Sequence, residues 1–210
     1  FSTIDMMNDM LGANAVAFQL PIGSEADFEG VVDLVLMKAI KYDNLSVQIE
    51  EIPAELKDRA QELREQMVEK LADFDDVLME KFLNEEEVTT EEIKHAARNA
   101  VLNLLITPVF CGTAFKNKGI QTLLDAVVDY LPSPIDRGIV LGYDTEDTEK
   151  TLSRKPSYKR PFSALAFKII NDAYVGQQTF IRVYSGELAA GSYVYNPNKK
   201  KKERVGRILR

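Results

Sequence analysis

The segment 107–134, TPVFCGTAFKNKGIQTLLDAVVDYLPSP, constrains the fold of this chain more than any other stretch. Its apolar first residues predict a short buried strand that ends at Gly112. After a polar loop, one apolar helix face is predicted by Ile120, Leu123, Leu124, Val127, Val128 and Leu131. A strand, a loop and a helix in this order form half of an α/β unit, in which ligands bind where strands end. We therefore expect a binding loop at residues 112–118.

The loop and the end of the helix also carry a family resemblance. They read Gly112-Thr113-Ala114-Phe115-Lys116-Asn117-Lys118-Gly119 and, from Tyr130 to Pro134, YLPSP. This pattern resembles the last guanine-binding motif of bacterial elongation factor G, where Ser is usual at the position of Thr113. The similarity runs along nearly the whole chain. LPIG and GVVDLVLMKA, from residues 20 and 30, resemble the subdomain inserted into that family's GTPase domain, and the strings beginning at residues 162 and 202 resemble its second domain, a β-barrel.

The resemblance implies that the loop contacts guanine through its backbone. Ala114 would donate its N–H to guanine O6, Thr113 would brace the loop, and Phe115 and Lys116 would flank the base. The candidate nucleotide-binding residues are therefore Gly112, Thr113, Ala114, Phe115 and Lys116. An exposed amide at a strand end can recognise an acceptor, and a small side chain lets the base approach. Spacing alone leaves an ordinary strand-to-helix turn as the alternative.

The chain lacks the other parts of a GTPase site. No G-x-x-x-x-G-K-[ST] loop occurs to hold phosphates and magnesium. Asp27-Phe28-Glu29-Gly30 fits the loose D-x-x-G pattern of a switch by chance, and Asn117-Lys118 lacks the aspartate of N-K-x-D. We name no catalytic or metal-binding residue. GTP or GDP with Mg is expected to bind a longer parent protein, and this chain alone is expected neither to bind nucleotide tightly nor to hydrolyse GTP.

Charge divides the chain into two parts. Of 26 basic and 33 acidic residues, 14 basic and only three acidic ones follow from Lys150 onward. Such asymmetry predicts two bodies with different partners, of which only the second suits an anionic surface. No apolar run reaches the roughly 20 residues of a membrane span. Cys111 is the only cysteine, so the chain cannot form an internal disulfide, and its cysteine content does not indicate an oxidising compartment. We expect a cytoplasmic protein that binds neither membrane nor DNA.

A row of carboxylates marks the first part. Pro53 is placed to begin a long helix, on which Asp58, Glu62, Glu65 and Glu69 recur along one face. The row is either a solvated face or a docking surface for a basic partner. The family's corresponding helix contacts the ribosomal stalk protein, and the resemblance implies that role here for Glu62, Glu65 and Glu69.

A basic cluster marks the second part, at Lys199, Lys200, Lys201, Lys202, Arg204, Arg207 and Arg210, of which the first five are the candidate partner-binding residues. Such residues bind phosphates in a salt-dependent way that ignores sequence. Lysines also protect edge strands from aggregation, which is the structural alternative. The resemblance implies contact with ribosomal RNA of the small subunit.

We expect an α/β plus β fold: an inserted α+β subdomain with an antiparallel sheet, the remnant of a P-loop GTPase α/β domain, and a partial translation-factor β-barrel. Extended runs are predicted at 14–20, 30–42 and 46–52, helices at 53–71, 72–83 and 89–104, and later strands at 162–170, 179–185, 192–195 and 203–210. Thr89 and Glu92 have capping-box spacing, and the lone His95 is expected to be an exposed helix residue. The expected domains are the end of a GTPase-domain helix (1–13), the inserted subdomain (14–106), the last strand and helix of the GTPase domain (107–134), a linker (135–159) and the partial barrel (160–210).

By resemblance, the chain is an internal piece of elongation factor G, whose GTP hydrolysis drives movement of transfer and messenger RNA on the ribosome. A start at Phe1 and an unpartnered last strand favour such a piece. A ribosome-protection protein or a peptide-release GTPase of the same architecture is the second interpretation. A ribosome-binding adaptor without enzymatic activity is the third.

Overall fold

The computed structural model describes residues 2–43, 46–147 and 149–209. These form two compact units that divide between Leu131 and Pro132. The division falls a few residues inside the predicted boundary of the last GTPase-domain helix. Each unit has its own sheets and is described by itself. Within the described ranges, no helix combines the length and the apolar run needed to cross a membrane.

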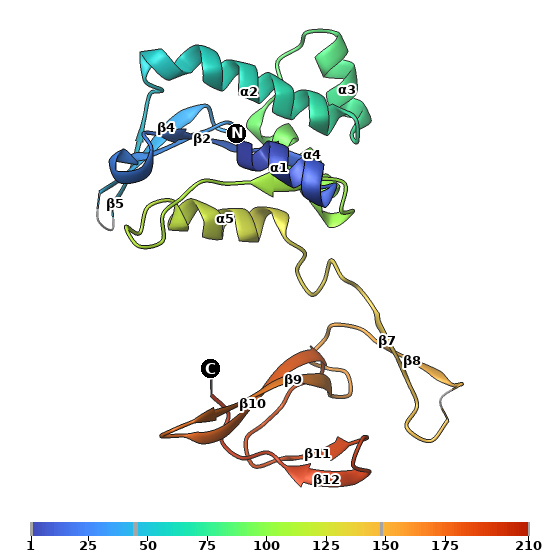
Figure 1. Cartoon of the computed structure of the whole chain (residues 1–210). Helices are drawn as coiled ribbons and strands as arrows, with labels where there is room; N and C mark the ends of the chain where they lie inside the picture. The colour runs from blue at the N-terminus through green and yellow to red at the C-terminus, as the bar shows by residue number, and fades with distance from the viewer. Residues whose placement is uncertain (1, 44–45, 148, 210) are drawn as a thin grey trace. The chain divides into compact units, whose positions relative to one another are not determined.

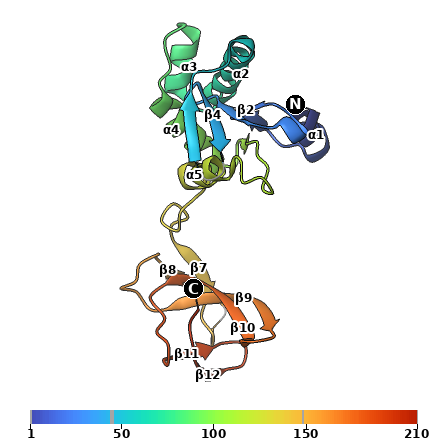
Figure 2. The same cartoon turned by 90° about the vertical axis from the view of Figure 1, so that its left-hand side faces the viewer.

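Unit 1 mixes helices with a four-stranded antiparallel sheet and a separate parallel strand pair. The antiparallel sheet has the order β2-β3-β4-β5, and β1 pairs with β6. In both views α2 lies on one side of strands β2 and β4, and α5 lies on the other (Figures 1 and 2). The elements are α1 (Ser2–Leu11), β1 (Ala15–Ala17), β2 (Gln19–Ile22), η1 (Glu25–Asp27), β3 (Gly30–Asp33), β4 (Lys38–Asp43), β5 (Ser46–Glu50), α2 (Ala54–Ala72), α3 (Asp76–Leu83), α4 (Thr90–Leu102), β6 (Thr107–Val109) and α5 (Ile120–Tyr130).

The extended run predicted at 30–42 is a hairpin, which corrects the prediction of one strand. The Asp33 carboxylate accepts hydrogen bonds from the amides of Val35 and Leu36, at 2.8 and 2.9 Å, and bends the chain. Met37 then adopts a positive φ of 53°, and the chain returns as β4. The turn residues Leu34 and Val35 are nevertheless buried. The turn was not recognisable from the sequence, because Leu34 and Val35 are apolar and pack in the core, so the pattern resembled one continuous strand.

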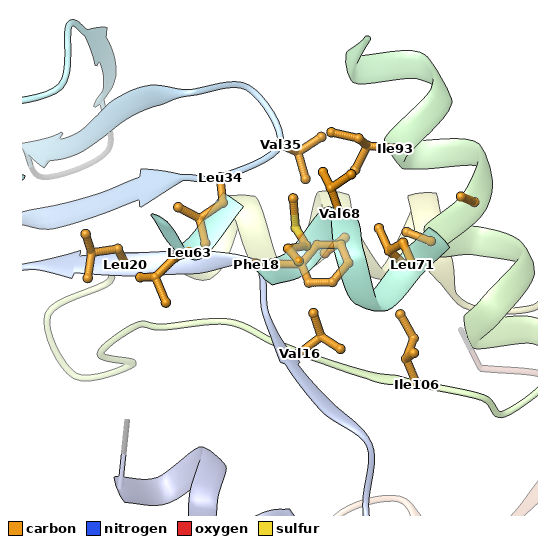
Figure 3. Close-up of a cluster of buried hydrophobic side chains, with 14 of the residues drawn as sticks. Val16, Phe18, Leu20, Leu34, Val35, Leu63, Val68, Leu71, Ile93 and Ile106 are labelled. Carbon is orange, nitrogen blue, oxygen red and sulfur yellow. The ribbon is translucent and has the colours of Figure 1, made fainter. Parts of the chain in front are cut away.

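Most of unit 1 shares one hydrophobic core. Figure 3 shows Leu63, Val68 and Leu71 of α2 and Ile93 of α4 converging on the segment that carries Val16, Phe18 and Leu20. Burial of a large apolar side chain stabilises a fold by about 1.5–3 kcal/mol. The same core reaches α5 through Ala126 and Tyr130, so the predicted inserted subdomain and the predicted GTPase remnant pack as one body.

Helix ends follow local capping chemistry. The capping box is confirmed: Thr89 Oγ1 accepts from the Glu92 amide, and Glu92 Oε2 accepts from the Thr89 amide at 2.9 Å. The helix predicted over 72–83, with Asp75 or Asp76 near its start, begins at Asp76, because the Asp75 side chain caps the amides of Val77 and Leu78. A carboxylate that satisfies free amides sets where a helix begins.

The apolar face predicted for α5 is not the face that unit 1 buries. Leu123, Leu124, Val127 and Val128 are 43–77% exposed, whereas Ala126 and Tyr130 are buried. The inner face is anchored by Tyr130, whose ring contacts those of Phe18 and Phe110 at centroid distances of 5.3 and 6.3 Å. Helical periodicity identified the apolar stripe correctly, but an aromatic cluster determined which face packs inside.

Unit 2 contains, within the described residues, three separate antiparallel strand pairs rather than one closed barrel sheet. The predicted linker 135–159 contains the first of them, which corrects that prediction. Asp144 and Asp147 accept from the amides of Glu146 and Glu149 at 3.0 Å, so the polar residues form turns between two strands. The last strand, predicted at 203–210, instead begins at Lys201 and ends at Arg204, and Arg210 lies outside the described residues. The pairs are β7 (Val140–Tyr143) with β8 (Thr151–Arg154), β9 (Ser163–Asp172) with β10 (Gly176–Ser185), and β11 (Tyr193–Asn196) with β12 (Lys201–Arg204).

Candidate functional site

The predicted binding loop follows the end of a parallel strand. β6 pairs with β1 in parallel register, with Ala15 opposite Thr107 and Ala17 opposite Val109. Both strands therefore point their carboxyl ends toward the same edge, and the loop 112–118 follows β6 there. This is the position at which open α/β sheets bind ligands.

The loop is a tight hairpin of its own. Thr113 and Lys118 form a bridge in which each amide donates to the other's carbonyl, at 2.8 and 3.2 Å. Between them the Asn117 amide donates to the Ala114 carbonyl at 3.1 Å, and Asn117 has a positive φ of 51°. Thr113 thus braces the loop through its backbone, whereas the resemblance assigned it that role without specifying which atoms act.

Two glycines close the base of this hairpin. Gly119 has a φ of 84°, and a Cβ there would lie 2.6 Å from the Cys111 carbonyl oxygen and 2.8 Å from the Cα of Gly112. A Cβ on Gly112 would lie 3.0 Å from the Lys118 carbonyl oxygen. A side chain at Gly119 would therefore overlap main-chain atoms, whereas one at Gly112 would make a tight contact with the Lys118 carbonyl oxygen. Gly112 therefore contributes to the loop by shape.

The tip of the hairpin faces solvent. Ala114 and Lys116 are exposed, and Phe115 is as exposed as in an extended peptide, at 106%. The Ala114 amide donates no hydrogen bond within the described part of the chain. The tip therefore offers a small residue with an available N–H and a neighbouring aromatic ring, which suits contact with a planar heterocycle.

Two lysines attach the loop to the segment before β3. Lys116 Nζ donates to the Ala26 carbonyl at 2.7 Å, and Lys118 Nζ donates to the Phe28 carbonyl at 2.9 Å. The resemblance predicted that Lys116 flanks the base. In this structure its ammonium is engaged with a backbone carbonyl, so only its aliphatic stem is free to lie beside a ligand.

Behind the loop lies a buried amide that the sequence did not single out. Gln19 is 3% exposed, and its Oε1 accepts from the Cys111 amide at 3.0 Å. Its Nε2 has no partner among the described residues. Burial also raises the pKa of the Cys111 thiol, which packs against Tyr42 and its neighbours as a small apolar residue. No motif or residue spacing in the sequence pointed to Gln19.

The predicted carboxylates line one wall of a groove. Glu62, Glu65 and Glu69 all face a groove of about 1300 Å³. Asp58 of the same row lies outside it. Glu62 also pairs with Arg59 at 2.6 Å, and Glu65 accepts from Gln61 at 2.9 Å.

The groove contains apolar residues that the sequence analysis missed. Leu36 of the β3–β4 turn and Phe82 and Leu83 of α3 line it and are partly or largely exposed. Arg64 holds the walls together, because its guanidinium donates to the carbonyls of Leu34, Val35 and Val88 at 2.7–3.1 Å. Burial lowers the pKa of this guanidinium. A surface that mixes carboxylates with apolar residues fits a basic amphipathic partner better than a carboxylate row alone.

The five candidate partner-binding residues of the predicted basic cluster lie on the β11–β12 hairpin, whereas Arg207 follows it and Arg210 lies outside the described residues. Lys199 and Lys200 form its turn, and Lys201, Lys202 and Arg204 lie on β12. Glu203 is placed within 3.6 and 3.9 Å of the ammonium groups of Lys199 and Lys201 and partly neutralises them. The structure therefore brings the cluster together and shows that its members are not electrostatically equivalent.

No known family model matches the chain. A protein of Thermus thermophilus whose crystal structure is known is similar to it, with 27% sequence identity and a TM-score of 0.73. The match covers 97% of this chain and 28% of that protein. The chain thus shares its fold with part of a considerably longer protein.

Proposed function

We propose that this chain is part of a translational GTPase of the elongation factor G type, which moves transfer and messenger RNA through the ribosome in the cytoplasm. In that protein it supplies the inserted subdomain, the last strand and helix of the GTPase domain, and the start of the second domain. The observation that carries the proposal is the loop 112–118. It follows a parallel strand at the ligand-binding edge, and the Ala114 amide at its tip is exposed without a partner among the described residues.

Exposed apolar surfaces in both units support a larger assembly of this kind. The exposed apolar residues of α5 suit a helix that packs against additional strands of an α/β sheet. In unit 2, Leu165, Phe167 and Ile169 of β9 and Phe180 of β10 are 42–62% exposed, which suits a barrel wall whose interior is completed by further strands.

The chain's own contribution to the site is recognition of the base. The Ala114 N–H donates to the guanine O6, the bridge between Thr113 and Lys118 keeps that amide in place, and Phe115 and the stem of Lys116 cover the ring. Adenine carries an amino donor at the equivalent position, so a fixed N–H there disfavours it. The P-loop, switches and N-K-x-D motif of the longer protein hold GTP or GDP with Mg and carry out hydrolysis.

The two charged surfaces are assigned to ribosomal partners. The acidic groove with Glu62, Glu65 and Glu69 binds the stalk protein, and the basic hairpin binds ribosomal RNA. Both assignments rest on charge complementarity and on the resemblance. For the groove, the apolar residues Phe82 and Leu83 add the hydrophobic contact that a protein partner needs.

Titration with a fluorescent guanine nucleotide tests the proposal. The full-length protein is expected to bind it, and the 210-residue chain alone is expected to bind weakly or not at all. In the full-length protein, Ala114→Pro removes the N–H and should weaken guanine binding by about tenfold or more, which is the loss of one buried hydrogen bond. Ala114→Gly keeps the N–H and serves as the control.

Equal binding by the Ala114→Pro and Ala114→Gly proteins would contradict the role of the loop. Ribosome binding by the 210-residue chain with no nucleotide response in the full-length protein would favour the adaptor interpretation instead.

A further inference from the structure

The β11–β12 hairpin has two chemically different faces. Tyr193 pairs with Arg204 and Tyr195 pairs with Lys202 in the antiparallel register. Because alternate residues and cross-strand partners share a face, these four side chains lie together. We call them the tyrosine face. The opposite face carries Val194 and Glu203.

The tyrosine face is open to solvent and carries uncompensated positive charge. Tyr193 is 67% exposed and Tyr195 is 51% exposed. The salt bridges of this hairpin, among the described residues, join Glu203 to Lys199 and Lys201 and involve neither Lys202 nor Arg204. The two cations beside the tyrosines are therefore available for phosphate groups, as is Lys200 of the turn, which is not on the tyrosine face.

Aromatic rings combined with cations are the pattern that binds single-stranded nucleic acids. Bases stack on exposed rings whatever their sequence, while lysine and arginine follow the phosphates. Two residues on one strand face are about 6.6–6.8 Å apart, which is twice the roughly 3.4 Å between stacked bases. Two tyrosines at this spacing suit bases that have been separated from one another, and a duplex does not present such bases.

We propose that the tyrosine face binds unpaired nucleotides of an RNA strand, with Tyr193 and Tyr195 stacking on bases and Lys202 and Arg204 contacting phosphates. The proposal deepens the assignment of the basic hairpin to RNA and rests on it for the choice of RNA. It changes that assignment in one respect: the turn lysines Lys199 and Lys200 are expected to contribute less to RNA binding than the tyrosine face. Single-stranded DNA has the same phosphates and similar bases and is therefore included in the test.

Fluorescence anisotropy of labelled oligomers of about 12 nucleotides, within the site sizes of single-strand binding domains, tests this proposal with the whole chain. Single-stranded RNA is expected to bind more tightly than duplex RNA of the same length. Tyr193→Thr combined with Tyr195→Thr keeps residues that favour strands. This variant should lose about tenfold or more in affinity for the single strand while keeping the salt dependence. Tyr174→Thr, which changes a tyrosine that is 98% exposed elsewhere in unit 2, is the matched control.

Matched charge variants separate the two faces. Lys202→Gln with Arg204→Gln should weaken binding and reduce the slope of log K against log salt by about 1.4, or about 0.7 per phosphate contact. Lys199→Gln with Lys201→Gln removes the same charge from the side that Glu203 neutralises and should have the smaller effect. Circular dichroism of each variant checks the fold, and the single variant Tyr193→Thr replaces the double variant if that one unfolds.

Four results would overturn the proposal: unchanged affinity of the tyrosine variants, equal effects of the two charge pairs, duplex binding as tight as single-strand binding, or DNA binding tighter than RNA binding. The measurement uses neither guanine nucleotide nor ribosome. Its failure would leave the guanine loop unaffected, and failure of the nucleotide titration would leave the oligonucleotide result standing.

Discussion

At the scale of single residues, Gly119 determines whether the loop 112–118 can form. Its backbone lies against Cys111 and Gly112, where any side chain would overlap main-chain atoms. Main-chain atoms cannot move aside as the end of a flexible side chain does. The requirement for glycine is therefore steric as well as conformational.

Gly119→Ala should lower the free energy of unfolding of unit 1 by about 2–5 kcal/mol, combining a positive-φ cost of about 1–2 kcal/mol with an overlap cost of about 1–3 kcal/mol. Gly12→Ala is the control, because Gly12 has a φ of 60° and a Cβ added there would meet no atom within 4 Å. Urea denaturation measures both. Equal losses would show that close approach contributes nothing at Gly119.

At the scale of elements, the capping box of α4 links helix stability to pH. The ammonium of Lys81 lies 2.6 Å from Glu92 Oε1, and Thr89 donates to the other oxygen. The hydrogen bond from Lys81 is the main cause that lowers the pKa of Glu92 to about 2, and the bonds from Thr89 add to it. A carboxylate with a lowered pKa stabilises the fold above its ordinary pKa.

The stabilisation from Glu92 should be complete above its ordinary pKa of 4.5 and disappear as the pH falls toward about 2. Glu92→Gln should therefore be less stable than wild type near neutral pH and approach it at the acid end. Glu91→Gln removes the same charge from the same helix turn without the capping contacts. Thermal unfolding from about pH 2 to neutrality measures the difference, and parallel curves for all three proteins would refute the linkage.

The second element-scale prediction concerns α5. Tyr130→Ala removes a buried ring and should cost about 3–5 kcal/mol, whereas Val128→Ala on the exposed stripe should change stability by less than about 0.5 kcal/mol. Urea denaturation of the 210-residue chain compares them. A large loss at Val128 would show that the apolar stripe is packed in solution.

At the scale of the whole molecule, the two units carry surfaces of opposite charge. Unit 1 presents the acidic groove and unit 2 presents the basic hairpin, in agreement with the charge division of the sequence. The proposed basic protein partner and the proposed RNA partner would therefore bind different surfaces of one chain.

Reversing two groove charges, Glu62→Lys with Glu65→Lys, should slow stalk-dependent GTP turnover of the full-length protein several-fold, because like charges oppose docking of a basic partner. Turnover without the stalk should not change. Glu55→Lys with Asp58→Lys makes the same charge change on α2 outside the groove. Unchanged stalk-dependent turnover in the Glu62→Lys/Glu65→Lys variant would show that these carboxylates form a solvated helix face and do not dock a partner.

Local patterns predicted the elements well and their packing less well. Helical spacing located α2, α4 and α5, and the glycine-bounded loop was placed correctly after β6. The errors occurred at two kinds of site: where a side chain bends the backbone beside it, and where a polar composition fits either a linker or turns between strands. Asp33 turned an apparent strand into a hairpin, and Asp144 and Asp147 formed turns in what composition suggested was a linker.

By itself the sequence determined the helix periods, the capping box, the glycine-bounded loop 112–118 and the separation of charge, because each depends on residue types or on neighbours a few positions apart. Only the tertiary structure decided that α5 buries Tyr130 instead of its apolar stripe, that Phe82 and Leu83 join the carboxylates in one groove, and that Glu203 neutralises one side of the basic hairpin. The physical reason is that burial and surface chemistry arise from contacts between segments, and the spacing of residues along one segment does not specify its neighbours.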